Sequence, residues 1–244
     1  MKPLQSLRTL WLVRSFDVGK IARTNQCCVG VVALFDESGL GLPSPWSNDK
    51  ANTLSESKIL IIGGGSNCGR FGTQLAKLAG FETVVVVGGD EEELKNFGAT
   101  HVVDRHGDQE VVLQNIRNIV GDDLIYAFDA YNGPSGQHLA INALSNSRRG
   151  ALARLVFSRG ALDESKIHIK NAGYELKNVL GLSHMKPQVA TSFWEHITEY
   201  MTQAKIKPLK YTVEWGLDAE KVNEVLDRYR EGKAVNQVHF HLNE

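Results

Sequence analysis

Residues 58–80 place an apolar run, a glycine cluster and a helical pattern side by side, in the sequence KILIIGGGSNCGRFGTQLAKLAG. The apolar run at 59–62 is typical of a buried strand in a parallel sheet. From Gly69 onward, Phe71 and Leu75 recur at the spacing of one helix face. A strand, a glycine turn and a helix in this order are the context in which a glycine-rich motif binds a dinucleotide. The glycines let the backbone approach a pyrophosphate, and the helix N-terminus presents free N–H groups to that anion.

The glycine-rich motif departs from the usual pattern at its centre. Aligned on Gly69 as the last glycine, it reads Gly64-x-Ser66-x-x-Gly69, so a serine replaces the middle glycine. Serine is small enough for a close approach, and its hydroxyl would add a donor. The alternative is a glycine turn that only packs a strand against a helix. We predict that the residues lining the pyrophosphate are Gly64, Ser66, Asn67, Cys68 and Gly69.

The composition argues against several other classes of protein. The 244 residues carry a net charge of −1, without the basic excess or charge run that would favour nucleic-acid binding. No uninterrupted apolar segment approaches the roughly 18 residues needed to span a membrane. The basic and apolar residues 1–26 are either a surface helix or non-native start, or a mitochondrial transit sequence. We expect a cytoplasmic protein, with a mitochondrial location as the minor alternative.

The cysteines and histidines do not have the spacing of a metal site. Three cysteines, Cys27, Cys28 and Cys68, give neither a disulfide framework nor a paired C-x-x-C zinc motif. We interpret them as buried small side chains in a reducing compartment, with a nucleophilic role for Cys28 or Cys68 as the alternative. No metal is expected, because the following histidines do not cluster with acids at ligand spacing: His168, His184, His239 and His241.

Strand and helix patterns alternate along most of the chain. This alternation predicts an α/β fold with a doubly wound parallel sheet of the Rossmann type and a C-terminal helix–strand tail. We divide the chain into an N-terminal remnant and linker (1–57), a dinucleotide-binding domain (58–205) and the tail (206–244). Strands are predicted at 59–62, 83–87, 101–103, 124–128, 152–157 and 177–181, with a lone terminal strand at 235–242. Helices are predicted at 28–40, from Gly69 onward, at 90–97, at 110–120, at 135–144 with Ser135 as its cap, at 193–204 and at 219–229.

The end of the second predicted strand bears on the choice of cofactor. It reads Gly88-Gly89-Asp90, followed by three glutamates. Asp90 lies about 20 residues after Gly69, the offset at which a carboxylate accepts a hydrogen bond from the adenosine ribose 2′-hydroxyl. An acidic group at this point would repel a 2′-phosphate, which favours NADH over NADPH. The alternative is that Asp90 only caps the helix that follows it.

Three segments together resemble the medium-chain dehydrogenase/reductase superfamily, most closely its zinc-free fungal enoyl-reductase and quinone-reductase-like members. They are IIGGGSNCGRFGTQLAKLAG at 61–80, GATHVVDR at 98–105 and YAFDAYN at 126–132. The resemblance implies NAD(P)H-dependent hydride transfer to a small enone, enoyl or quinone-like substrate. It favours NADPH, so the choice between the two cofactors stays open. No residues match the zinc ligands of the family, so the resemblance implies no zinc.

The resemblance also points to residues at the nicotinamide end of the site. Asp129, Ala130 and Tyr131 follow the fourth predicted strand at the carboxyl edge of the sheet, where doubly wound folds bind ligands. By resemblance, their backbone flanks the nicotinamide ribose, and Gly181 and Leu182 lie near the nicotinamide. The alternative for Tyr131 is an aromatic side chain that packs its own loop. No catalytic acid is identified.

The resemblance begins near Cys28, and the catalytic domain that precedes the nucleotide domain in this family is essentially absent from the sequence. The alternative function is therefore a catalytically incomplete NAD(P)-binding protein, acting as a sensor or a partner subunit. Family members often form dimers through an edge of this sheet, and residues 166–170 alternate like an edge strand. We predict a homodimer through that segment, with a lone surface strand protected by its lysines as the alternative.

Overall fold

The computed structural model describes residues 25–47, 54–155, 161–231 and 237–241. The chain forms two compact units, which divide between Lys207 and Pro208. Predictions for residues 1–24 lie outside the described residues, as do parts of the strands predicted at 152–157 and 235–242. Among the described helices, none is both long and apolar enough to cross a membrane.

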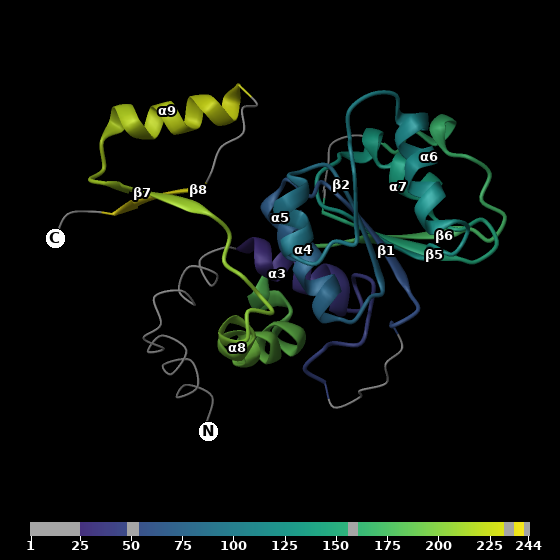
Figure 1. Cartoon of the computed structure of the whole chain (residues 1–244), viewed down its shortest axis with the longest axis horizontal. Coiled ribbons are helices and arrows are strands. Elements are labelled where there is room, and N and C mark those ends of the chain that lie inside the picture. The colour runs from purple at the N-terminus through teal and green to yellow at the C-terminus, as the bar shows by residue number, and fades with distance from the viewer. Residues whose placement is uncertain (1–24, 48–53, 156–160, 232–236, 242–244) are drawn as a thin grey trace. The chain divides into compact units, whose positions relative to one another are not determined.

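The first unit is built around a six-stranded sheet in the order β3-β2-β1-β4-β5-β6, in which all paired strands are parallel (Figure 1). The strand order reverses between β1 and β4, which is the point at which doubly wound folds bind ligands. The predicted α/β class with a doubly wound parallel sheet is confirmed. The strands are β1 (Lys58–Ile62), β2 (Thr83–Val87), β3 (His101–Val103), β4 (Tyr126–Asp129), β5 (Gly150–Arg154) and β6 (Tyr174–Asn178).

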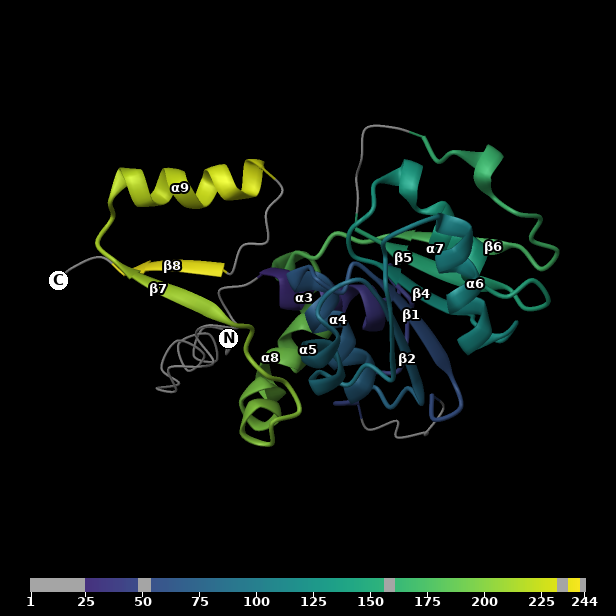
Figure 2. The same ribbon diagram turned by 45° about the horizontal axis from the view of Figure 1, so that its top comes forward.

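Helices cover both faces of this sheet (Figure 2). Leu60 and Ile61 point to opposite faces of β1, yet both are fully buried. This two-sided burial explains why β1 and β2 are continuous apolar runs rather than alternating patterns. One face carries α3 (Asn25–Phe35), α4 (Asn67–Leu78) and α5 (Glu91–Asn96), and the other carries α6 (Gln109–Val120) and α7 (His138–Ala143). The last helix of this unit, α8 (Pro187–Thr202), packs against α3.

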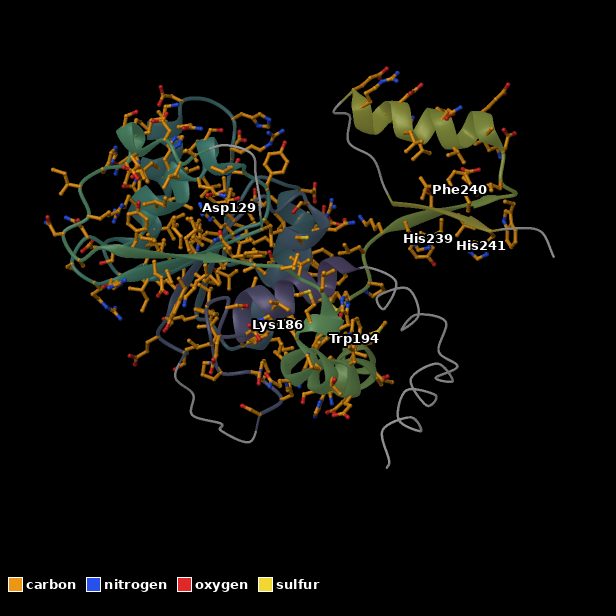
Figure 3. The ribbon with its side chains drawn as sticks, turned by 180° about the vertical axis from the view of Figure 1, so that it is seen from behind. Asp129, Lys186, Trp194, His239, Phe240 and His241 are labelled. Carbon is orange, nitrogen blue, oxygen red and sulfur yellow. The ribbon has the colours of Figure 1, made fainter. Side chains whose placement is uncertain are left out.

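The second unit is a short βαβ element. It consists of β7 (Tyr211–Trp215), α9 (Ala219–Arg230) and β8 (Gln237–His241), and its two strands pair in parallel. The sequence predicted a terminal strand without a partner, whereas the structure pairs it with β7, which was not predicted. Figure 3 shows Phe240 on the α9 side of β8 and its neighbours His239 and His241 on the other side.

Three predictions of local structure are wrong. The sixth strand, predicted at 177–181, is β6 (Tyr174–Asn178), so only two of the predicted residues lie in it. Ser135 does not cap a helix, because Pro134 begins a 3-10 turn, η1 (Pro134–Gly136), and α7 starts only at His138. Residues 167–170 alternate in sequence but form no strand. Instead, the Asn142 side chain donates to the Lys166 carbonyl at 2.9 Å and accepts from the His168 N–H at 2.9 Å. The edge strand on this side of the sheet is β6.

Candidate dinucleotide-binding site

The glycine-rich turn after β1 is held against the carboxyl end of β2. The N–H groups of Gly63 and Gly64 both donate to the Val87 carbonyl at 3.1 Å. Gly63 has a φ of +86°, a left-handed conformation that a side chain would strain. The Ser66 N–H donates back to the Gly63 carbonyl at 2.9 Å, which closes the turn. The turn therefore lies at the edge of the sheet where the strand order places a ligand.

The two outer glycines of the predicted motif have no room for a side chain. A β-carbon on Gly64 would lie 2.4 Å from the Gly88 carbonyl oxygen. A β-carbon on Gly69 would lie 2.2 Å from the Gly63 carbonyl oxygen. Both distances are much shorter than a van der Waals contact, so the close approach of turn and helix depends on glycine at both positions.

Ser66, the residue that replaces the middle glycine, is the N-cap of α4. Its backbone is extended, and its hydroxyl oxygen accepts a hydrogen bond from the Gly69 N–H at 3.0 Å. The sequence predicted a hydroxyl donor at this position but not the capping role. Because the oxygen acts as the acceptor for the cap, the O–H remains able to donate to an anion.

The start of α4 presents unsatisfied donors at the mouth of this turn. Within the described residues, the N–H groups of Gly65, Asn67 and Cys68 have no acceptor. Such N–H groups, together with the positive end of the helix dipole, attract anions. The turn therefore fits the pyrophosphate of a dinucleotide, and the predicted motif residues lie together in the structure.

The two glycines after β2 face the turn. Gly88 and Gly89 have φ values of +74° and +102°. A β-carbon on Gly89 would lie 2.8 Å from the Gly65 nitrogen, so these two loops also depend on glycine for their close contact. The Gly88 N–H donates to the Val103 carbonyl at 2.9 Å and joins this loop to β3. The structure thus brings the predicted residues of both loops to one corner of the sheet.

Two of the four acidic residues at this corner, Asp90 and Glu93, are engaged, whereas Glu91 and Glu92 are exposed in the first turn of α5. Asp90 is the N-cap of α5, and its Oδ1 accepts from the Glu93 N–H at 2.7 Å. This is the capping role that the sequence left open as an alternative. Glu93 in turn forms an ion pair with Arg70, whose Nε lies 2.8 Å from its Oε2.

Arg105 also lies at this corner, and it was not predicted as a site residue. A β-carbon on Gly88 would lie 2.9 Å from Arg105 Cδ, so the aliphatic part of this side chain lies over Gly88. Arg105 forms no ion pair with any carboxylate of the described residues, whereas Asp104 beside it pairs with His106 at 2.7 Å. The sequence did place Arg105 just after a predicted strand, at the carboxyl edge of the sheet, and this position could have identified it as a site residue.

Asp129 ends β4 and organises the loop that follows it (Figure 3). Its carboxylate is fully buried and accepts from the N–H groups of Tyr131 at 3.0 Å and Asn132 at 2.8 Å. Burial raises the pKa of the Asp129 carboxyl, although these hydrogen bonds act in the opposite direction. Tyr131 itself is 67% exposed and lies beside Gly63, where an added β-carbon would lie 2.4 Å from Tyr131 Cβ. Asp129 therefore holds Ala130 and Tyr131 at the mouth of the turn.

The segment after β6 contains the other predicted nicotinamide residues, Gly181 and Leu182. Gly181 packs directly on α3, because a β-carbon there would lie 2.4 Å from Val29 Cα. The Leu182 N–H donates to the Leu180 carbonyl at 2.9 Å. These two residues therefore follow the carboxyl end of β6, on the opposite side of the β1/β4 switch from Gly88.

The three cysteines lie in the helices that support the site. Cys27 and Cys28 are buried in α3, and burial raises the pKa of both thiols. Burial also raises the pKa of the Cys68 thiol to about 11. Thiols of this kind are protonated near neutral pH and are poor nucleophiles, which favours a packing role. The described residues contain no group of three or more histidine, cysteine, aspartate or glutamate side chains placed to hold a metal.

Together, the sheet order and the glycine-rich turn define a dinucleotide-binding domain of the Rossmann type. Residues 68–199, more than half of the chain, match the family model described as zinc-binding dehydrogenase. The chain belongs to this family, as a nucleotide-binding domain of the medium-chain dehydrogenase/reductase superfamily.

Curated relatives match this chain over part of their length. The trans-enoyl reductase resD of Aspergillus sclerotiorum is 31% identical over 141 residues, which cover 52% of this chain and 39% of that protein. The dehydrogenase orsE of Emericella nidulans is 28% identical over 204 residues, which cover 82% of this chain and 54% of that protein. The chain therefore spans roughly a third to a half of the length of these relatives and of a zinc-type alcohol dehydrogenase-like protein of Schizosaccharomyces pombe.

Solved structures share the fold at low sequence identity. The CurK enoyl reductase has a TM-score of 0.65 at 15% identity, with 99% of this chain and 65% of that chain covered. A mycobacterial protein solved in complex with NADPH has a TM-score of 0.62 at 17% identity, with 93% of this chain and 64% of that chain covered. These similarities support the fold that the strand order defines.

Proposed function

We propose that this chain is the nucleotide-binding part of an NAD(P)H-dependent oxidoreductase that delivers hydride to an enone, enoyl or quinone-like substrate. The observation that carries the proposal is the glycine-rich turn at the switch point of the sheet. The turn and the first residues of α4 together present N–H groups that have no acceptor among the described residues. The names of the relatives, a trans-enoyl reductase and a dehydrogenase, support the reaction class.

The residues of this chain bind and orient the cofactor in the proposed function. The N–H groups of Asn67 and Cys68 hold the pyrophosphate, and the loops after β2 and β3 hold the adenosine half. The loops after β4 and β6 border the nicotinamide half. When bound, the reduced nicotinamide supplies the hydride, and the protein supplies placement and electrostatics.

We propose NADPH as the preferred cofactor, and Arg105 is the reason. Its guanidinium is always charged and has no carboxylate partner within the described part of the chain. Its aliphatic part lies over Gly88, beside the position at which the adenosine ribose is expected. An arginine at this point favours a 2′-phosphate, because guanidinium groups form strong hydrogen bonds with phosphate oxygens.

In the sequence, the acidic residues after β2 favour NADH over NADPH. The contacts that two of them make in the folded protein weaken that argument. Asp90 uses one carboxylate oxygen to cap α5, and Glu93 is paired with Arg70. Their charges are therefore already balanced in part by the helix N-terminus and by a cation. Arg105 is the cation that lies over Gly88, and without a carboxylate partner among the described residues it is able to select a 2′-phosphate.

The cofactor preference is tested by titrating the full chain and its Arg105→Gln variant with NADPH and NADH. We expect the variant to lose about tenfold to a hundredfold in NADPH affinity, the effect of one charge-assisted hydrogen bond, with its NADH affinity unchanged. Arg148→Gln is the matched control, since this exposed arginine precedes β5 at the opposite edge of the sheet. Equal losses for both cofactors, or none, would contradict the assignment.

The proposed reaction is tested on the same sample by following the loss of reduced-nicotinamide absorbance with an enone, an enoyl thioester and a quinone. Turnover of one of them supports the reductase, and an excess of chelator leaves the rate unchanged if no zinc takes part. Cofactor binding without turnover of any of the three would support the alternative, an NAD(P)-binding protein without activity of its own.

A further inference from the structure

The segment between β6 and α8, residues 179–186, contacts α3 and the turn after it at three separate places. The first contact is Gly181, whose α-carbon lies so close to Val29 that a β-carbon would fall 2.3 Å from Val29 Cγ2. Because both partners are close-packed, the backbone at Gly181 has little freedom to move away from or along α3. This contact fixes the start of the segment.

The second contact is a hydrogen bond between two small polar groups. The Ser183 hydroxyl donates to the Cys28 thiol sulfur at 2.7 Å, and the two residues are separated by most of the chain. The Trp194 side chain, from α8, and the Ser183 hydroxyl both lower the pKa of this thiol, while burial raises it overall. Cys28 therefore joins α3 to the β6–α8 segment, whose last residue, Lys186, is labelled in Figure 3.

The third contact is an ion pair at the end of the segment. Lys186 Nζ lies 2.8 Å from Asp36 Oδ1, directly after the end of α3, and the Asp36 side chain is only 12% exposed. Burial alone would raise the pKa of the Asp36 carboxyl, but hydrogen bonds from Lys186 and Ser38 lower it overall. Lys186 precedes the first residue of α8, where the helix dipole disfavours a cation, so Asp36 is the group that stabilises its charge here.

The position of the segment in the fold relates these contacts to the site. In a doubly wound sheet, the strands on one side of the switch hold the adenosine half of a dinucleotide and the strands on the other side hold the second half. β6 belongs to the second side, and residues 179–186 begin at its carboxyl end. The segment therefore borders the nicotinamide half, while Arg105 and Gly88 border the adenosine half.

We infer that α3 positions the β6–α8 segment against the nicotinamide half of the cofactor, through the Cys28–Ser183 hydrogen bond and the Asp36–Lys186 ion pair. Ser183 and Lys186 are then positioning residues for the bound nicotinamide. Cys28 acts as the buried acceptor for Ser183 rather than as a nucleophile, and Asp36 is the partner of Lys186. This inference rests on the proposed function, because it needs a dinucleotide that lies across both halves of the sheet.

The inference is tested by comparing two ligands on Ser183→Ala and Lys186→Met. One ligand is whichever of NADPH or NADH binds the wild-type chain more tightly, and the other is the matching adenosine fragment, which lacks the nicotinamide. We expect each variant to bind the dinucleotide about three- to tenfold more weakly, the range of one lost hydrogen bond or partly buried ion pair, and to bind the fragment as the wild type does. A purely structural role would weaken both ligands alike.

Matched controls come from similar groups outside this segment. Ser165→Ala removes a hydroxyl that donates to Asp163 at 2.6 Å in the β5–β6 connection. Lys221→Met removes the exposed partner of Glu214, 3.2 Å away in the second unit. We expect both controls to leave both affinities unchanged, and amide hydrogen exchange at 179–186 to accelerate only in the Ser183 and Lys186 variants.

The outcomes separate this inference from the proposed function. If the wild-type chain binds neither dinucleotide, the proposed function fails, and the inference fails with it. If the wild-type chain binds but the two variants show the same ratio of dinucleotide to fragment affinity as the wild type, only the inference is overturned. If the ratio falls in the variants and not in the controls, the positioning role is supported.

Discussion

Gly64 and Gly88, which lie in the loops after the neighbouring strands β1 and β2, approach so closely that a methyl group on Gly64 would fall 2.4 Å from the Gly88 carbonyl oxygen. The same methyl group would lie 2.4 Å from Val86 Cγ1. The pair brings the turn after β1 against the loop after β2, and so places the proposed pyrophosphate site beside the proposed adenosine site. The contact depends on close packing rather than on backbone conformation, because Gly64 has an ordinary negative φ.

The substitution Gly64→Ala should disrupt this contact. We expect it to destabilise the fold by about 1–3 kcal/mol, the usual cost of overpacking, and to abolish measurable dinucleotide binding. Thermal or urea unfolding and a fluorescence titration measure the two effects. Gly133→Ala is the control, since a β-carbon there meets nothing within 4 Å and its φ is −68°. A Gly64 variant as stable as this control would contradict the packing argument.

Ser66 allows capping and anion binding to be separated. Ser66→Ala removes the acceptor for the Gly69 N–H and should cost about 1 kcal/mol of stability. Ser66→Asp retains a good cap and adds a negative charge, so its stability should stay close to that of the wild type. Its affinity for the dinucleotide should fall about tenfold or more, because the carboxylate repels a pyrophosphate. An aspartate variant with unchanged affinity would place the anion elsewhere.

Asp129 predicts a specific dependence of stability on pH. Burial raises the pKa of its carboxyl in the folded state, so the charged form is disfavoured there relative to the unfolded chain. The associated stability is present below the unfolded pKa of about 3.9 and is lost as the pH rises through the folded pKa. Relative to Asp129→Asn, the wild type should therefore lose unfolding free energy as the pH rises above about 4. Urea unfolding of both proteins at several pH values tests this, and a difference that is constant with pH would refute it.

The predicted homodimer now depends on β6, because residues 167–170 are not a strand. Among the described strands, β6 pairs with β5 alone and ends the sheet, so its outer edge has no partner strand in this part of the chain. Two such edges pairing with each other would give a dimer, although the Glu175–Lys177 ion pair resembles the charges that protect free edges. We expect light scattering at tens of micromolar to give the mass of a dimer, with exchange protection at 174–178 that is lost on dilution. A monomer mass under these conditions would count against it.

The sequence predicted the sheet well because its signals are local. β1, β2 and β3 are short apolar or β-branched runs bounded by glycine and charged residues, and α4 follows directly from a glycine turn. β7 was not predicted, since its strand character depends on pairing with β8, more than twenty residues away in the chain. Ser135 was misjudged because Pro134 begins a separate 3-10 turn before α7. Alternation at 167–170 was read as a strand, although the Asn142 side chain holds this segment in another way.

The sequence predicted the site residues of the glycine-rich turn, but it did not predict the contacts that residues elsewhere in the chain make around the site. Gly64, Ser66 and Gly69 follow from a motif with fixed spacing. The role of Arg105 depends on the loops after β2 and β3 lying together, which no local pattern encodes. The contacts between Cys28 and Ser183 and between Asp36 and Lys186 join residues far apart in the chain, so they emerge only from the folded structure.

The most direct test of the account is a titration of the full wild-type chain with NADPH, followed by nicotinamide fluorescence and by amide hydrogen exchange. We predict saturable binding of one NADPH per chain, with protection of the amides at Gly65, Asn67 and Cys68, whose donors the bound pyrophosphate would then engage. Absence of saturation at millimolar NADPH and NADH, or binding that leaves these amides exchanging as before, would contradict the assignment of the glycine-rich turn as a dinucleotide site.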